Sequence, residues 1–115
     1  MAWADDLETI LGLIGRIERT VAGETAESFQ ASPDAIDAVA YRLGMIGEHC
    51  ERLPQEIRDR HPDVPWRAMV GLRNIVAHSY DMISAPIVWR TAVDELGPVR
   101  EMAEAESRRL RDGSG

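Results

Sequence analysis

Apolar residues recur at intervals of three and four along most of the chain, and this spacing restricts the fold more than any other feature of the sequence. Residues three and four apart share one face of an α-helix, whereas a half-buried strand alternates every second residue. No segment alternates over enough length to predict a strand. The sequence therefore predicts an all-α protein, with apolar stripes at Trp3, Leu7, Ile10, Ile14 and Ile17, at Ile36, Val39, Leu43 and Ile46, at Met69, Leu72 and Val76, and at Ile87, Val93, Val99 and Met102.

Serine, proline and glycine mark where these helices begin and end. Gly23 closes the first stripe, and residues 32–33 and 84–86 each place a serine hydroxyl before a proline of a first helical turn. Residues 24–31 are expected to be a polar link and residues 54–60 a short helical turn. The third long helix is expected from Pro65 to between residues 78 and 81. The last helix is expected to start at Ala85 and to kink at Pro98, because proline removes a backbone donor and crowds the preceding turn.

These segments predict an antiparallel bundle of about four main helices plus one short helix. A chain of 115 residues has room for one core, so residues 1–110 are expected to form a single domain and residues 111–115 a frayed tail. Gly44 and Gly47 lie on the stripe of the second long helix and indicate close approach of another helix. A bundle of this size often completes its burial by self-association, which makes a homodimer an expectation.

The charged residues limit the possible functions. All 13 basic residues are arginine, against 20 acidic residues, so the formal net charge is −7. The absence of lysine excludes a Schiff base and a P-loop. An acidic chain disfavours nucleic-acid binding, but the excess acid lies in residues 1–40, whereas residues 51–73 hold five arginines and four acids. The single cysteine, Cys50, excludes an intrachain disulfide and fits a reduced cytoplasm, and we expect neither a signal peptide nor a membrane span.

Residues 73–80, RNIVAHSY, gather the side chains best suited to chemistry. Asn74 and His78 are four apart and share a helix face, so the amide could hold the imidazole in one orientation. Arg73 and His78 lie roughly 140° apart around a helix, so a shared site needs a helix edge, a helix end or a second subunit. A histidine that moves protons and an arginine that binds phosphate suit metal-free cleavage of RNA. Tyr80 could bond the same phosphate or stack on a base.

The chain from about Tyr41 to Val99 resembles the HepT-like branch of the HEPN superfamily. The resemblance rests on the run MIGEHCERLPQEIRDRHPDVPWRAMVGLRNIVAHSYDMI, whose R-x4-H-x-Y pattern is met by Arg73, His78 and Tyr80. Asn74 is the polar residue that follows the arginine. The resemblance implies a HEPN-like bundle, a homodimer that brings two motifs into one cleft, and a metal-independent ribonuclease toxin without a cofactor. It implies these four residues as the catalytic set.

The resemblance also implies a partner protein. In this family the antitoxin is a minimal nucleotidyltransferase that silences the toxin by transferring AMP onto the motif tyrosine, which here is Tyr80. Many relatives carry an acidic residue between the histidine and the tyrosine; Ser79 stands there in this chain, so any role of that carboxylate is unfilled. The alternative is a non-catalytic helical adaptor that binds a nucleotidyltransferase and uses the motif as a dimer contact.

The remaining polar residues have plainer interpretations. Adjacent helical residues point in different directions, so Glu48-His49-Cys50 does not predict a metal site. Trp66 is expected in the core or an interface, and only secondarily as a surface for base stacking. Residues 101–106 are expected to be an exposed helix end. Four further arginines could contact the RNA backbone or form a solvated charged face: Arg52, Arg58, Arg60 and Arg67.

Overall fold

A computed structural model describes residues 2–113 of the chain, apart from the side chains of Ala2 and Tyr80. This part contains no strand, which confirms the all-α prediction. None of its helices combines the length and the apolar character that a membrane span requires. In chain order the helices are α1 (Ala2–Val21), α2 (Ala26–Gln30), α3 (Pro33–Glu51), α4 (Gln55–Arg60), α5 (Trp66–His78), the 3-10 helix η1 (Tyr80–Met82), α6 (Ala85–Asp94) and α7 (Leu96–Arg111).

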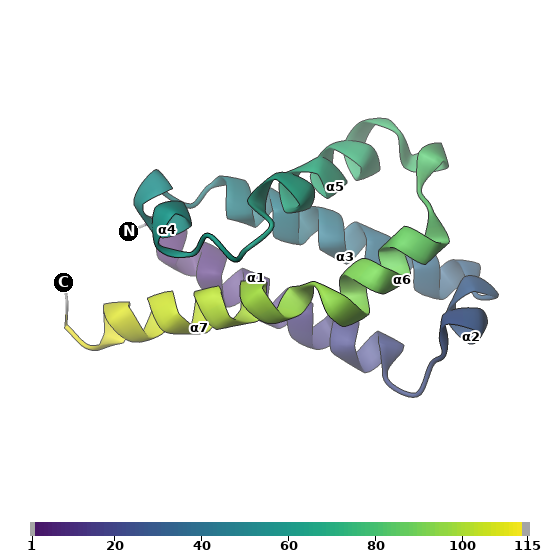
Figure 1. Cartoon of the computed structure of the whole chain (residues 1–115), viewed down its shortest axis with the longest axis horizontal. Coiled ribbons are helices and arrows are strands. Elements are labelled where there is room, and N and C mark those ends of the chain that lie inside the picture. Colours follow the sequence, from purple (N-terminus) through teal and green to yellow (C-terminus); the bar gives the residue numbers. More distant parts are fainter. Residues whose placement is uncertain (1, 114–115) are drawn as a thin grey trace.

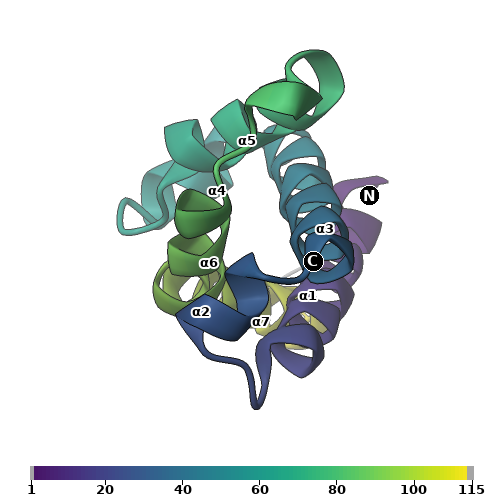
Figure 2. The same ribbon diagram turned by 90° about the vertical axis from the view of Figure 1, so that its right-hand side faces the viewer.

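Helix α3 is the centre of the bundle. It packs against α1 on one side and α5 on the other, as the end view in Figure 2 shows. Neighbouring long helices run antiparallel, and α7 lies along α1 (Figure 1), which confirms the predicted antiparallel bundle. The apolar stripes of α1, α3 and α7 meet in the core, where fully buried side chains include Leu7, Ile10, Ile14, Leu43, Ile46, Val99 and Met102.

The predicted helix boundaries follow from local capping. The Ser32 hydroxyl accepts from the Ala35 backbone N–H at 3.3 Å, and Ser84 accepts from Ile87 at 3.4 Å. Each serine precedes a helix with proline in its first turn, as expected. Gly23 follows the end of α1 with a φ of 81°, a left-handed conformation that glycine adopts without a steric penalty.

Two glycines let α3 and α5 approach closely, as the sequence predicts. A Cβ added at Gly47 would lie 2.1 Å from the backbone oxygen of Met69 and 3.2 Å from the Cβ of Arg73. One added at Gly44 would lie 3.0 Å from the Val76 side chain. The missing side chain of Gly47 therefore places Arg73 of α5 directly against α3.

The prediction of a polar link between residues 24 and 31 is wrong. Residues 26–30 form α2, which starts with a capping box between Thr25 and Ser28. Phe29 is fully buried, and its ring centroid lies 5.2 Å from that of Trp89. One aromatic residue in a five-residue helix provides no periodicity, so the pattern could not reveal this element.

The prediction of one kinked helix through Pro98 is also wrong, because the helix is interrupted at Glu95. Pro98 is the third residue of α7, where a backbone N–H has no partner within the helix in any case. Ending α6 at Asp94 removes the clash with the proline ring. Ile87 and Val93, expected in the core, are 48% and 43% exposed.

Candidate functional site

The RNIVAHSY segment spans the C-terminal half of α5 and the turn that follows. The Ser79 N–H donates to the Ile75 carbonyl at 2.8 Å, and the Met82 N–H donates to Ser79 at 2.8 Å, so the α-helix ends at His78 and η1 follows at once. His78 is exposed at this helix end. The backbone of Tyr80 opens η1, but its side chain lies outside the described part of the structure, so its predicted role is not tested.

Arg73 is held by two carboxylates of α3. Its guanidinium forms an ion pair with Glu51, and its Nε lies 3.6 Å from Glu48 Oε1. The Nε atom is buried and has no hydrogen-bond partner among the described residues. The close helix contact at Gly47 brings Arg73 within reach of both acids. In a single chain, the positive charge of the Arg73 guanidinium is therefore balanced by carboxylates of α3.

Asn74 and His78 share the exposed side of α5. Over residues 2–113 the structure shows no hydrogen bond between the Asn74 amide and the His78 imidazole. Both side chains face water, which competes for such a bond. The side chains of the segment thus divide into an arginine that faces α3 and an amide and an imidazole that face solvent.

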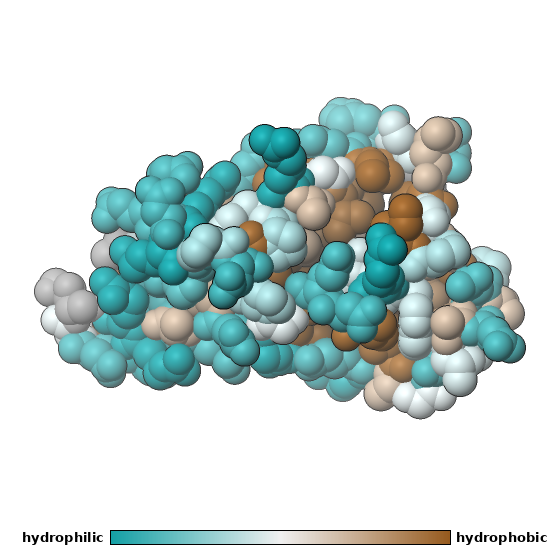
Figure 3. Space-filling view, in the orientation of Figure 1, coloured by the Kyte–Doolittle hydropathy of each residue, from teal (hydrophilic) through white to brown (hydrophobic). Residues whose placement is uncertain are grey.

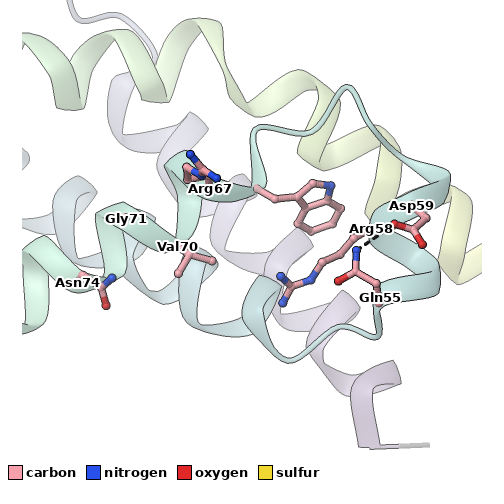
Figure 4. A pocket seen from close by; sticks show the side chains of 8 residues that line it. Gln55, Arg58, Asp59, Arg67, Val70, Gly71 and Asn74 are labelled. Atoms are coloured by element: carbon pink, nitrogen blue, oxygen red, sulfur yellow. Dashed lines mark hydrogen bonds between the residues drawn. The ribbon is translucent and has the colours of Figure 1, made fainter.

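An open cleft of about 610 Å³ lies between α4 and α5. Figure 4 shows that its lining includes Asn74 and two of the four candidate RNA-binding arginines, Arg58 and Arg67. Arg58 also donates to the backbone oxygen of Glu51 at 2.6 Å, at the C-terminus of α3, where a cation opposes the negative end of the helix. Arg67 is exposed.

The structure places the other two candidate RNA-binding arginines, Arg52 and Arg60, elsewhere. Arg52 lies 3.4 Å from Asp6 and 3.6 Å from Glu48. Arg60 donates two hydrogen bonds to Glu106, at 3.0 and 2.6 Å. These two guanidinium groups are therefore engaged within the chain and lie outside the cleft.

The side chains of Glu48, His49 and Cys50 do not point to a common site. His49 Nδ1 lies 2.6 Å from the carboxylate of Asp6, which is buried. Burial raises the pKa of the Cys50 thiol to about 12, against a smaller lowering by the charge of Arg58. The thiol is therefore protonated at neutral pH. In the described part of the chain, no three histidine, cysteine or acidic side chains gather as a metal site would require.

Glu106 contradicts the expectation of an exposed helix end at residues 101–106, since only 2% of it is exposed. Burial by itself would raise the pKa of its carboxyl, but hydrogen bonds from Arg60 and His61, with their charges, outweigh it and hold the pKa below the ordinary value. The His61 Nε2 lies 2.6 Å from the carboxylate. The sequence spacing could have predicted this burial, because Glu106 follows Met102 by four residues and so lies on the apolar stripe of α7.

Comparison with known proteins points to one family. A family model described as ribonuclease HepT-like matches residues 10–106. The chain is 36% identical over 80 residues to a protein of Caldanaerobacter subterraneus subsp. tengcongensis named "Putative RNase", a match that covers 70% of each chain. It is 29% identical over 92 residues to the "Probable ribonuclease HepT" of Thermococcus cleftensis, covering 80% of this chain and 84% of the relative. No solved structure matches significantly.

Proposed function

Since this chain belongs to the ribonuclease HepT-like family, we propose that it is the toxin of a toxin–antitoxin system and a metal-independent endoribonuclease. The observation that carries the proposal is the family motif on α5, with His78 exposed at the helix end and Arg73 against α3. An RNA substrate and a reduced Cys50 both fit the cytoplasm.

The proposed chemistry is proton transfer with charge stabilisation. His78, exposed at the end of α5, moves a proton to or from the ribose 2′-hydroxyl or the leaving oxygen, as histidine side chains do in general acid–base catalysis. Arg73 binds the phosphate and stabilises the charge that builds during displacement. Asn74 orients the site and Tyr80 assists at the phosphate.

A homodimer would complete this site. Arg73 and His78 are five positions apart, which places them roughly 140° apart around α5, so one copy does not present both to one phosphate in a simple way. Apolar side chains gather in a hollow between α5 and α6, visible in Figure 3. Of these, Ile75 is 39%, Ile87 48% and Met82 73% exposed. An apolar surface next to the motif supports a second copy there.

Adenylation of Tyr80 by a nucleotidyltransferase antitoxin is the proposed control of the activity. An AMP group on the phenol would add negative charge and bulk close to where the substrate phosphate binds. Intact-mass measurement after coexpression with a minimal nucleotidyltransferase antitoxin tests this, with one AMP-sized increment expected on Tyr80. An unmodified tyrosine would contradict the adenylation but leave the ribonuclease proposal standing.

The ribonuclease activity is tested with total RNA in EDTA. Wild type should cleave, and Arg73→Ala and His78→Ala should each lose most of the activity. Arg90→Ala is the matched control, since Arg90 is an exposed arginine on α6 outside the motif. No cleavage by wild type, or cleavage by Arg73→Ala and His78→Ala at the wild-type rate, would refute the proposal.

The ion pairs of Arg73 favour the alternative, a non-catalytic adaptor. A guanidinium held by Glu48 and Glu51 could have only the structural role of joining α5 to α3. It predicts that overexpression of wild type is harmless to cells and that His78→Ala weakens self-association. Growth arrest by wild type that His78→Ala relieves would exclude the adaptor.

A further inference from the structure

The cleft between α4 and α5 holds groups that the proposed cleavage chemistry does not use. Its volume of about 610 Å³ lies within the roughly 300–1,000 Å³ of small-molecule sites. Helix α4 contributes one wall and α5 the other (Figure 4). The lining residues are Gln55, Arg58, Asp59, Trp66, Arg67, Val70, Gly71 and Asn74.

The α5 wall is continuous with the motif. Trp66, Val70 and Asn74 are spaced by four residues and share one face of the helix. The span from Trp66 to Asn74 is roughly 12 Å at 1.5 Å per residue. Gly71 lies between them, and a Cβ added there would meet nothing within 4 Å. The cleft is therefore an open extension of the face that carries the proposed catalytic amide.

The two walls of the cleft meet at a π surface, formed by Arg58 of α4 and Trp66 of α5. The Arg58 guanidinium carbon lies 5.8 Å from the centroid of the Trp66 ring. The same arginine is fixed by its bond to the Glu51 backbone oxygen, and the Trp66 indole donates to the His61 carbonyl at 3.0 Å. Both planar groups are thus held in place, and nucleobases stack on indole and guanidinium planes.

Polar groups that fit the edge of a base lie beside this surface. Gln55 Nε2 donates to Asp59 Oδ1 at 2.9 Å, which leaves the second Asp59 oxygen and the Gln55 carbonyl able to accept. An exocyclic amino group, which adenine, cytosine and guanine carry, can donate its two N–H bonds to both acceptors, whereas uracil offers only the single N–H of its ring N3. A carboxylate here also repels a bare phosphate, so the cleft favours a base over the backbone. Arg67, exposed at the cleft, is placed for an adjoining phosphate.

We propose that the cleft is a base subsite that takes one unpaired, amino-bearing nucleobase of the RNA next to the phosphate bound at the motif. The inference rests on the proposed ribonuclease function and adds a base preference to it. Trp66 and Arg58 supply the stacking surface, and Asp59 with Gln55 discriminates against uracil.

Binding of uncleavable RNA separates this subsite from catalysis. Fluorescence anisotropy with 2′-O-methyl hexanucleotides of adenine, cytosine or uracil should show tighter binding of the first two by roughly fivefold. Asp59→Asn should bring the three affinities together, because an amide can donate to uracil as well as accept. Gly71→Met should fill the open cleft and weaken binding of adenine and cytosine oligonucleotides about tenfold. Far-UV circular dichroism checks that each variant is folded.

Two variants control for the substitutions themselves. Gly12→Met places the same side chain on α1, where a Cβ also meets nothing within 4 Å, and Asp37→Asn removes an exposed carboxylate of α3. Both should bind as wild type does. Equal affinity of wild type for all three oligonucleotides, an unchanged preference in Asp59→Asn, or an unchanged affinity of Gly71→Met would each overturn the subsite while cleavage of total RNA still stands. A wild type that neither binds nor cleaves RNA would overturn the proposed function and the subsite together.

Discussion

The contact between α3 and α5 at Gly47 is the point where a single methyl group should have the largest effect on fold and site together. In Gly47→Ala the new Cβ would lie 2.1 Å from the Met69 carbonyl oxygen and 2.9 Å from its carbonyl carbon. Both atoms belong to the backbone of α5, so no rotamer change relieves the contact. The two helices must separate by about 1 Å, since packed carbon and oxygen atoms do not approach much below 3 Å.

The expected cost follows from two opposing contributions. Overpacking of this kind costs about 1–3 kcal/mol, and a contact with backbone belongs at the upper end. Replacing glycine with alanine inside a helix recovers about 1 kcal/mol. The net loss in the free energy of unfolding is therefore about 2 kcal/mol, which lowers the Tm by roughly 8 °C for a domain of this size. Separation of the helices also carries Arg73 away from Glu51, so the motif is disturbed.

Urea and thermal unfolding at a fixed protein concentration measure this loss, since self-association would make the Tm concentration-dependent. Gly12→Ala is the matched control, because that glycine also lies inside a helix but has open space around its Cα. We expect Gly12→Ala to raise stability by about 0.5–1 kcal/mol. If Gly47→Ala were as stable as Gly12→Ala, the close approach of α3 and α5 would be refuted.

Three further predictions concern ionisable groups. Glu51→Gln should free Arg73 to bind phosphate and lower the KM for RNA several-fold. The control is Glu8→Gln, which removes an exposed carboxylate of α1. An unchanged KM in Glu51→Gln would show that the ion pair does not compete with the substrate. The lowered pKa of Glu106 means that its ionised form stabilises the fold above the unfolded value of about 4.3, and this contribution is lost as pH falls through the folded value. The urea midpoint should therefore fall as the pH drops below about 5, and Glu106→Gln should reduce that dependence; parallel curves of wild type and variant would contradict it. Burial raises the pKa of Cys50 to about 12, so at pH 8 its thiol should react with a thiol reagent only as fast as the chain unfolds. If the native protein reacted as fast as the protein unfolded in urea, the thiol would not be buried.

Features decided within a few residues could be predicted from the sequence. The caps at Ser32 and Ser84 require only a hydroxyl and the next backbone N–H groups, and both are present. Gly47 is similarly informative, because a glycine on an apolar stripe has few purposes other than close packing. The placement of the motif on a helix that ends at His78 follows from the same local rules.

Features decided by partners distant in sequence could not be predicted. Glu106 is buried because Arg60 and His61, more than 40 residues away, supply its hydrogen bonds. Arg73 is neutralised by Glu51, which lies on another helix. From charge alone, Glu106 is expected to be exposed to solvent and Arg73 is expected to be free to bind a phosphate. Only the packing of α3 on α5 and of the α4 segment on α7 distinguishes a structural ion pair from a functional cation.

The distribution of these ion pairs changes what the net charge of −7 implies for RNA binding. If all five arginines of residues 51–73 faced solvent, one copy could neutralise several phosphates and bind RNA mainly by counterion release. Arg52 and Arg60 are instead paired with acids, and Arg58 caps α3, which leaves Arg67 and, after exchange of its carboxylates, Arg73. Two phosphate contacts correspond to a salt slope of only about −1.4 per copy on single-stranded RNA. The affinity then depends more on stacking and hydrogen bonds than on phosphate neutralisation, and the base subsite proposed between α4 and α5 would supply both.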